Sequence, residues 1–319
     1  MIITLTANPS HDRTVTLTGP LERGAVQRAE SVLSQAGGKG VNISRASVAA
    51  GIPSIAVLPA AKDDPYVLEL LGAGIDCRPV PNEGTLRVNI TISEPDGTTT
   101  KLNSPGPSVT PLVLRGLAES LRRRAASADW IVLAGSLPPG APVEWYAELV
   151  GALRDAGSRI AVDTSDAPLR ALVERLDDAP PHLMKPNGEE LASFTGGDAD
   201  VLESDAEAAA KAAYSLVERG VETVLATLGA HGAVLVTADG AWYAAPPPTE
   251  VVSTVGAGDS SLFGYLLGDI ENRPPAQRLA LAVAYGSAAA GLPGTTIPHP
   301  TEVRPELVSV RDLRPTQGD

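Results

Sequence analysis

Residues 130–162, with the sequence WIVLAGSLPPGAPVEWYAELVGALRDAGSRIAV, contain one complete unit of the pattern that decides the fold. Short apolar runs at Trp130–Ala134 and Arg159–Val162 are typical of buried strands. The stretch Val143–Ala156 between them predicts a helix, and Pro142 lies near its start, where a missing N–H group costs little. A strand, a helix and a second strand in this order predict a piece of parallel sheet.

Similar units recur along the rest of the chain. Further buried strands are predicted from apolar or β-branched runs at Ile2–Thr6, Ile55–Leu58 and Thr223–Thr227. A hairpin is predicted where Ala-Asp-Gly separates Ala233–Thr237 from Ala241–Ala245. Helices are predicted from Ala/Leu-rich stretches at Val41–Ala50, Tyr66–Leu71, Pro111–Ala125, Ala167–Leu176, Ala206–Arg219, Asp259–Asp269 and Ala276–Ala290. This alternation predicts an α/β fold with a mostly parallel central sheet and helices on both faces.

Two segments break the alternation of strands and helices. Thr14–Ser34 and Thr85–Leu102 alternate polar and apolar residues and show little helical period. Within the second segment, Val88–Ser93 followed by Pro95-Asp-Gly-Thr predicts a strand, a turn and another strand. We therefore expect a small sheet inserted in the α/β body. No linker is long enough to separate two independent domains, so residues 1–319 are expected to form a single domain.

Composition and charge limit the classes of partner. Hydrophobic residues make up 43% of the chain and charged residues 20%, which is ordinary globular usage. The net charge of −13 disfavours binding to nucleic acids or anionic membranes, although a local cluster of cations can still hold a small anion. The single cysteine, Cys77, excludes a disulfide framework. Without a signal peptide or an apolar run of 18 residues, we expect a cytoplasmic protein with no membrane partner.

The segment Ser253-Thr-Val-Gly-Ala-Gly-Asp259 is the first candidate for chemistry, because it directly precedes an apolar helical run. Gly256 and Gly258 allow a sharp turn and a close approach of the backbone to a ligand. The helix that follows offers unpaired N–H groups and a positive dipole end to phosphate oxygens. Asp259 is then either a catalytic acid beside an anion site or only the capping residue of a helix.

Three other segments are weaker candidates on their own. Gly37-Gly-Lys-Gly-Val-Asn42 opens a helical stretch, but its spacing is not that of a Walker P-loop, just as the turn that begins at Gly256 does not complete a dinucleotide fingerprint. Asn187 and Glu190 are three residues apart, which suits either Mg²⁺, mostly through water, or a helix cap. Thr227-Leu-Gly-Ala-His-Gly-Ala233 follows a strand and is either a nucleotide loop or a hairpin turn.

The order of these motifs is more specific than any one of them. From Thr4 to about Thr296 the chain resembles the ribokinase-like sugar kinases, also called the phosphofructokinase B family. The resemblance to the branch of 1-phosphofructokinases and tagatose-6-phosphate kinases is carried by Thr6-Ala-Asn-Pro-Ser-His-Asp12, Asn103-Ser-Pro-Gly-Pro107 and Gly135-Ser-Leu-Pro-Pro-Gly140. The family resemblance is carried by GGKGVN, TLRVN, GSLPPG, DTS, KPNGEEL, TLGAHGA and STVGAGDS, in that order.

The resemblance implies a fold and a reaction. The fold is a three-layer sandwich with a mostly parallel central sheet and a small β-sheet lid, expected here from segments at about 12–35 and 84–103. The reaction transfers the γ-phosphoryl group of ATP to a sugar hydroxyl, with Mg²⁺. We expect fructose 1-phosphate as the acceptor. Tagatose 6-phosphate and fructose 6-phosphate remain alternatives, as does a non-catalytic sensor of sugar phosphates or nucleotides. A homodimer through the lid is a further expectation.

The resemblance also implies roles for single residues. Asp259 would accept the hydroxyl proton, and the backbone of Gly256, Ala257 and Gly258 would form the anion hole. The sugar phosphate is expected to contact Asp12, Gly37, Gly38, Lys39, Asn42, Arg87, Lys101, Asn103 and Ser136, with Lys39, Arg87 and Lys101 on its phosphate. ATP is expected to contact Lys185, Asn187, Thr227, Gly229, Ala230, Gly232, Gly258 and Ser287. Asn187 and Glu190 would act on Mg²⁺ indirectly.

Two residues depart from the family pattern. Asp166 replaces the glycine of the usual D-T-S-G motif. Lys101 stands where 1-phosphofructokinases often carry an acid, so it is either a phosphate contact or a surface charge of the lid. In contrast, Lys39 favours the 1-phosphate branch, because the minor bacterial 6-phosphofructokinase usually has glycine at that position.

Overall fold

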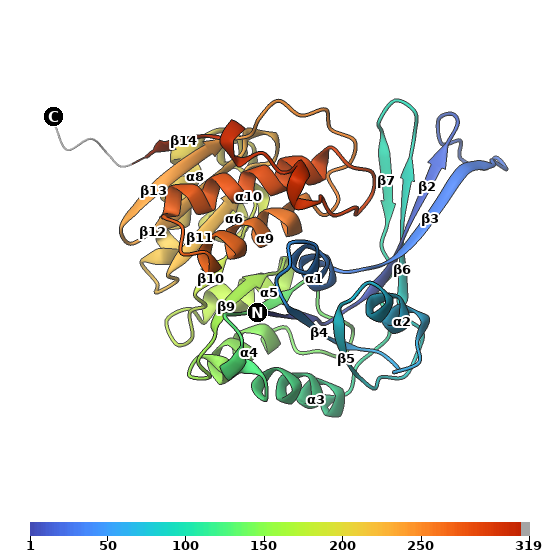
Figure 1. Ribbon diagram of the computed structural model, residues 1–319, viewed down its shortest axis with the longest axis horizontal. Coiled ribbons are helices and arrows are strands. Elements are labelled where there is room, and N and C mark those ends of the chain that lie inside the picture. The colour runs from blue at the N-terminus through green and yellow to red at the C-terminus, as the bar shows by residue number, and fades with distance from the viewer. Residues whose placement is uncertain (314–319) are drawn as a thin grey trace.

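The computed structural model describes residues 1–313, and its main sheet runs through the centre of the molecule (Figure 1). The strand order is β14-β13-β12-β11-β10-β9-β8-β1-β4-β5, and the seven strands from β11 to β5 are parallel. The bounds are β1 Ile2–Thr6, β4 Ser54–Pro59, β5 Asp76–Val80, β8 Trp130–Ala134, β9 Arg159–Asp163, β10 Leu183–Met184, β11 Thr223–Thr227, β12 Ala233–Thr237, β13 Gly240–Ala245 and β14 Ser309–Asp312.

Helices cover both faces of this sheet and complete three layers. Successive residues of a strand point to opposite faces, so Ile2 and Val132 join one core cluster and Ile3 and Leu133 the other. The face of Ile2 is covered by α1 (Lys39–Ala49), α2 (Pro65–Gly72), α9 (Ala257–Ile270) and α10 (Pro275–Ala290). The opposite face is covered by α3 (Pro111–Arg122), α4 (Trp145–Leu153), α5 (Asp166–Glu174), α6 (Gly188–Thr195), α7 (Ala199–Ser204) and α8 (Ala206–Val217).

The predicted α/β architecture is confirmed, with small differences at element ends. The helix predicted over Val143–Ala156 is shorter, and the one predicted over Pro111–Ala125 ends at Arg122 before a separate 3₁₀ turn. Strand β5, at one edge of the sheet, was not predicted. Its sequence DCRPV carries a proline and two charged residues, which an edge strand tolerates because one side of it pairs with no neighbour.

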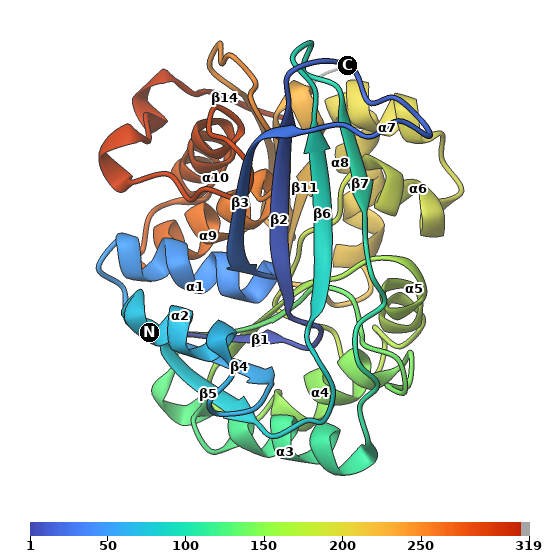
Figure 2. The ribbon, with the colours of Figure 1, turned by 90° about the vertical axis from the view of Figure 1, so that its right-hand side faces the viewer.

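A second sheet of four strands forms the lid (Figures 1 and 2). Its order is β3-β2-β6-β7, with β2 and β6 parallel and the outer pairs antiparallel. The bounds are β2 Ser10–Leu17, β3 Ala29–Gly37, β6 Arg87–Ser93 and β7 Thr99–Leu102. Asp12 is paired with Asn89, and Thr14 with Thr91, so these polar side chains share one face of the lid.

The topology brings the sequence motifs to one edge of the main sheet. Four of the motifs (GSLPPG, DTS, KPNGEEL and TLGAHGA) lie at the carboxyl ends of β8, β9, β10 and β11, and these ends meet at the same edge because the strands are parallel. Ligands of open α/β sheets bind at this edge. In residues 1–313, the structure contains no helix with both the length and the apolar character that crossing a bilayer requires.

Candidate active site

A cavity of about 1150 Å³ lies between the lid, the carboxyl edge of the main sheet and the start of α9. It is lined by every residue to which the sequence assigned a role except Gly37, which lies behind the cavity wall. These lining residues are Asp12, Gly38, Lys39, Asn42, Arg87, Lys101, Asn103, Ser136, Lys185, Asn187, Glu190, Thr227, Gly229, Ala230, Gly232, Gly256, Ala257, Gly258, Asp259 and Ser287. The motifs therefore form one site.

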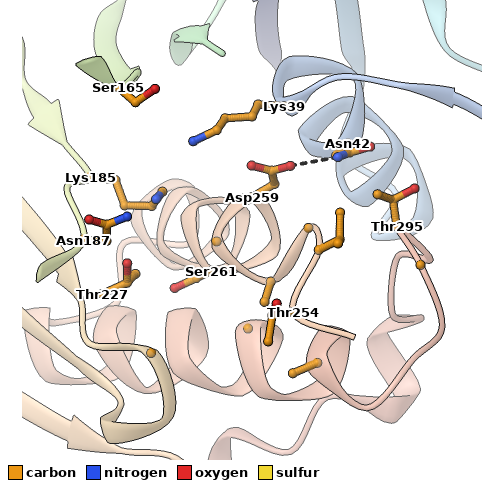
Figure 3. A pocket seen from close by; sticks show the side chains of 18 of the residues that line it. Lys39, Asn42, Ser165, Lys185, Asn187, Thr227, Thr254, Asp259, Ser261 and Thr295 are labelled. Atoms are coloured by element: carbon orange, nitrogen blue, oxygen red, sulfur yellow. Dashed lines mark hydrogen bonds between the residues drawn. The ribbon is translucent and has the colours of Figure 1, made fainter. Parts of the chain in front are cut away.

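Asp259 lies in the first turn of α9 and faces this cavity (Figure 3). The helix begins after Gly256, whose φ of 81° is in the left-handed region that glycine adopts without strain. The first turn leaves backbone N–H groups without helical partners beside the carboxylate. The side-chain amide of Asn42 donates a hydrogen bond of 2.8 Å to Asp259 Oδ2. The turn thus fixes one carboxylate next to a group of anion-binding N–H donors.

The environment of Asp259 suits a general base. Burial raises the pKa of this carboxyl to about 6, against the attraction of Lys39; the nearby charge of Asp163 raises it further and the bond from Asn42 lowers it. At pH 7 and above the group is mostly ionised, yet it binds a proton more readily than an exposed aspartate. Such a group can accept a proton from a hydroxyl as a new bond forms at the oxygen.

A second buried carboxylate, Asp163, stands at the end of β9 between two lysines. Asp163 Oδ1 accepts a hydrogen bond of 2.8 Å from Lys39 Nζ, and Lys185 Nζ lies 3.3 Å from Oδ2. Burial alone would raise the pKa of Asp163, but the two lysines hold this pKa below its ordinary value. In Figure 3 both lysine ammonium groups lie on the same side of the Asp259 carboxylate. The pair concentrates positive charge beside the proposed base.

Lys39 lines the cavity and also forms an ion pair with the main sheet. Lys39 was expected to join Arg87 on the phosphate of the sugar, which stays a prediction; the structure shows its ammonium group in contact with Asp163. The physical reason is the buried charge of Asp163, which has few other partners to balance it. The attraction of Asp163 and Asp259 raises the pKa of Lys39 in spite of its burial, so the side chain stays charged.

The lid supplies a second polar group of side chains. Asp12 Oδ1 accepts hydrogen bonds from Ser10 Oγ at 2.7 Å and from Asn89 Nδ2 at 3.2 Å, and burial raises the pKa of Asp12. In the described residues, the amide oxygens of Asn42 and Asn89 are buried without a hydrogen-bond partner. Buried acceptors are normally satisfied, so these two oxygens are free to accept hydrogen bonds from a ligand in the cavity.

Arg87 anchors the lid to the loops below it. Its guanidinium donates to the carbonyl oxygen of Asn8 at 2.9 Å and to that of Ser104 at 3.2 Å. Burial lowers the pKa of Arg87, while Asp12 opposes this effect. An arginine lining the cavity can hold a phosphate through its planar pair of N–H donors. Lys101 lines the same cavity from the neighbouring strand β7.

Gly37, the residue outside the cavity surface, packs against the back of Asp12. A Cβ atom at this position would collide with the Asp12 carboxylate. The carbonyl oxygen of Gly37 accepts a hydrogen bond of 2.6 Å from the buried hydroxyl of Tyr66. Gly37 therefore makes room for the cavity-lining Asp12 rather than facing the cavity itself.

Asn187 and Glu190 form the helix cap that was one of their two predicted roles. Asn187 Oδ1 accepts from the N–H of Glu190 at 2.7 Å, and Glu190 Oε2 accepts from the N–H of Asn187 at 2.9 Å. Both residues also line the cavity. No group of three or more His, Cys, Asp or Glu residues within 1–313 could hold a metal ion. The one carboxylate offered by Glu190 suits Mg²⁺ that is held largely by water and by phosphate oxygens.

Sequence reasoning missed several lining residues. Two of them were inside the quoted motifs without a role: Asn89 ends LRVN, and Ser10 lies between Thr6 and Asp12. Asp163, which begins DTS, was also given no role; it lies buried beneath the cavity surface, in contact with Lys39 and Lys185. The apolar wall near Ser287, formed by Pro246, Pro247, Pro248, Val251 and Val283, carried no such signal. Val283 comes from α10 and the other four from the loop between β13 and α9, and only the fold brings them together.

Comparison with known proteins agrees with the motifs. The model of the pfkB family carbohydrate kinases matches residues 6–302. A 1-phosphofructokinase from Rhodobacter capsulatus is 36% identical over 323 residues, covering 98% of each chain. The crystal structure of Escherichia coli phosphofructokinase-2 with potassium superposes with a TM-score of 0.85 at 28% identity, over 94% of this chain and 96% of that one.

A more distant structure shows the fold alone. Ribokinase from Thermotoga maritima has a TM-score of 0.71 at 17% identity, over 95% of this chain and 97% of that one. The ribokinase-like fold and the family resemblance expected from the sequence are therefore confirmed, and with them a phosphotransferase that uses an alcohol group as acceptor. The chain belongs to the pfkB family of carbohydrate kinases.

Proposed function

We propose that the enzyme transfers the γ-phosphoryl group of ATP to the 6-hydroxyl of fructose 1-phosphate, giving fructose 1,6-bisphosphate and ADP. The observation that carries the proposal is the placement of Asp259 at the start of α9, between the lysines on Asp163 and the polar face of the lid. One carboxylate thus stands between a site for the donor and a site for the acceptor. The relatives named 1-phosphofructokinase support this choice of sugar phosphate.

In the proposed mechanism Asp259 accepts the hydroxyl proton as the oxygen attacks the γ-phosphorus and the bond to ADP breaks. Phosphoryl transfer depends mostly on positioning and on stabilising charge. The N–H groups at Gly256, Ala257 and Gly258 would bind the transferred phosphoryl group. Mg²⁺, held near Glu190 and Asn187 through water, would supply further charge neutralisation.

The lysines beside Asp163 have a role that follows from their position. Lys185 Nζ lies near the first turn of α9, since a Cβ atom on Gly258 would come within 3.3 Å of it. Lys39, at the start of α1, contacts the carboxylate of Asp163, as Lys185 does. We assign both ammonium groups to the phosphoryl group in transfer, because they flank the anion-binding turn rather than the lid.

The lid would bind the sugar phosphate and exclude water. Asp12, Asn42 and Asn89 offer acceptors to sugar hydroxyls, while Arg87 and Lys101 offer cations to the phosphate already present on the sugar. An unphosphorylated sugar would offer these two cations no anionic group to bind. A closed lid would also protect ATP from attack by water.

An ADP-release assay across three acceptors tests the proposal. We expect the largest kcat/KM with fructose 1-phosphate, compared with fructose 6-phosphate and tagatose 6-phosphate. A preference for either alternative would reassign the substrate within the same mechanism. Release of ADP from none of the three, together with tight binding of one, would favour a sensor and contradict catalysis. Asp259→Asn is the matched inactive control.

We also propose that the lid forms a homodimer through its outer face. The strand register places Val15, Val32, Ile90, Ile92 and Leu102 on the face opposite Asp12, with Val32 57% and Leu102 54% exposed. An apolar sheet face of this kind is usually covered.

Light scattering tests the dimer. The wild type should have twice the mass of one chain, and the Ile92→Glu variant should have the mass of one chain. Leu307→Glu, an exposed apolar site outside the lid, is the control; a wild-type monomer would contradict the proposal.

A further inference from the structure

A second cavity, of about 560 Å³, lies away from the active site at the open edge of the main sheet. Its walls come from the loop before α2, from α2 itself, from β5 and from α3. The volume suits a ligand of the size of a nucleotide or a sugar phosphate. Neither the motifs nor the proposed reaction gives this cavity a role.

The cavity is basic, although the whole chain carries a net charge of −13. Four cations line it, namely Lys62, Arg78, Arg123 and Arg124, and no carboxylate lines it within residues 1–313. Arg78 and Arg123 are paired with Asp76 and Glu119. In the described chain Lys62 and Arg124 have no ion-pair partner, although Arg124 donates to Ser120. The local charge therefore favours an anion, and planar guanidinium groups are suited to phosphate oxygens.

Helix α2 connects this cavity to the active site. Val67 and Leu71 line the cavity, while two other side chains of the same helix hold the end of strand β3. The hydroxyl of Tyr66 donates to the carbonyl of Gly37, and Glu69 Oε1 accepts from the N–H of Ala36 at 2.8 Å. This strand end packs directly behind Asp12. A ligand that shifts α2 would therefore change the position of a residue that faces the sugar.

We propose that this cavity is a regulatory site for a small anion bearing phosphate, and that its occupancy is transmitted to the sugar site through α2. The neutral thiol of Cys77 at its floor takes no part in the chemistry, because burial raises its pKa to about 12. The proposal is reversible binding with no covalent step. If occupancy of either site shifts the position of α2, then binding at one site changes the affinity at the other.

Equilibrium dialysis with labelled inorganic pyrophosphate tests the binding. Pyrophosphate should also enter the active site, so we expect two molecules per wild-type chain. Lys62→Gln and Arg124→Gln should each weaken one of the two sites about tenfold, since each removes a charged donor. Arg122→Gln, at the last residue of α3 and outside the cavity, is the matched control and should keep both sites. One site in the wild type, or two unchanged sites in both variants, would overturn the proposal.

A kinetic measurement tests the coupling. The KM for the best sugar phosphate is measured with and without pyrophosphate in the wild type and in Lys62→Gln. Pyrophosphate that competes at the active site raises the KM in both proteins alike. The coupling is therefore measured by comparing the KM ratio, with over without pyrophosphate, between the wild type and Lys62→Gln. We expect the two ratios to differ at least about twofold. Equal ratios would overturn the regulatory role. The dialysis needs no turnover, so its result stands apart from failure of the proposed reaction.

Discussion

Replacing Asp259 with asparagine should make the protein more stable at pH 8 and abolish turnover. The aspartate is 6% exposed, and folding raises its pKa from 3.8 to about 6. A carboxyl whose pKa is raised on folding contributes stability below pH 4, where it is protonated in both states. That contribution is lost as the pH rises through the folded pKa. Asparagine has the same shape, carries no charge and can still accept the hydrogen bond from Asn42.

The magnitude follows from the pKa difference. At about 1.4 kcal/mol per pKa unit, the ionised carboxylate lowers the free energy of unfolding by about 3 kcal/mol at pH 8, and by roughly half of that at pH 5. A chain of 319 residues has an unfolding entropy of about 0.7 kcal/mol/K near its Tm, so 3 kcal/mol corresponds to about 4 °C. The gain in Tm should therefore decrease steadily from pH 8 to pH 4.

Scanning calorimetry of the wild type and Asp259→Asn at four pH values checks this reasoning. Asp163→Asn is the matched control, because Lys39 and Lys185 hold the pKa of Asp163 below its ordinary value. Removing the negative charge of Asp163 should destabilise the protein by about 3–5 kcal/mol at pH 8, since two ammonium groups would lose their buried partner. An Asp259→Asn protein with an unchanged or lower Tm at pH 8 would refute the argument.

Three other predictions concern charge. The kcat/KM should rise with pH through about 6 and level off above pH 7, as Asp259 ionises; a flat profile of ADP release from pH 5 to 8 would exclude it as the base. Arg87→Ala should mainly raise the KM for the sugar phosphate, whereas Lys39→Ala should mainly lower kcat. A fall in kcat for Arg87→Ala and a rise in KM for Lys39→Ala would instead place Lys39 on the sugar phosphate and Arg87 on the phosphoryl group in transfer. Asp269→Asn should cost about 3 kcal/mol in urea unfolding and leave kcat unchanged, because Asp269 binds Arg159 and Trp130 outside the cavity; a fall in kcat would contradict this.

The sequence predicted the parts of the molecule that depend on local pattern. Strands such as Trp130–Ala134 are uniformly apolar because both faces of a central parallel strand are buried, and this is visible without a structure. The glycine turn before Asp259 is also local. In contrast, β5 was missed, because an edge strand that contains Pro79 lacks the apolar run of a central strand.

The candidate site was predictable in its members and less so in its contacts. Nearly all the residues assigned to it line one cavity, which the ends of parallel strands, the lid and the start of α9 form together. Which charges meet could not be read from the motifs, because Lys39 and Asp163 are 124 residues apart. The departure at Asp166 shows the same limit. Its φ of 57° lies in the left-handed region, so the glycine usual in the family suits a backbone shape that the sequence does not reveal.

The two buried aspartates have different surroundings, and the proposed mechanism gives them different roles. Asp163 is fully enclosed and touches two lysines, so it stays ionised and acts as a fixed counter-charge that holds them in place. Among residues 1–313, the carboxylate of Asp259 accepts a hydrogen bond from the amide of Asn42 and forms no ion pair, and its pKa of about 6 lies within reach of physiological pH. A proton can therefore be exchanged at Asp259 and not at Asp163. A difference of this kind between the pKa values of two carboxyl groups supports the proposal that Asp259 handles the proton, and the difference follows from the number of cations that each carboxylate contacts.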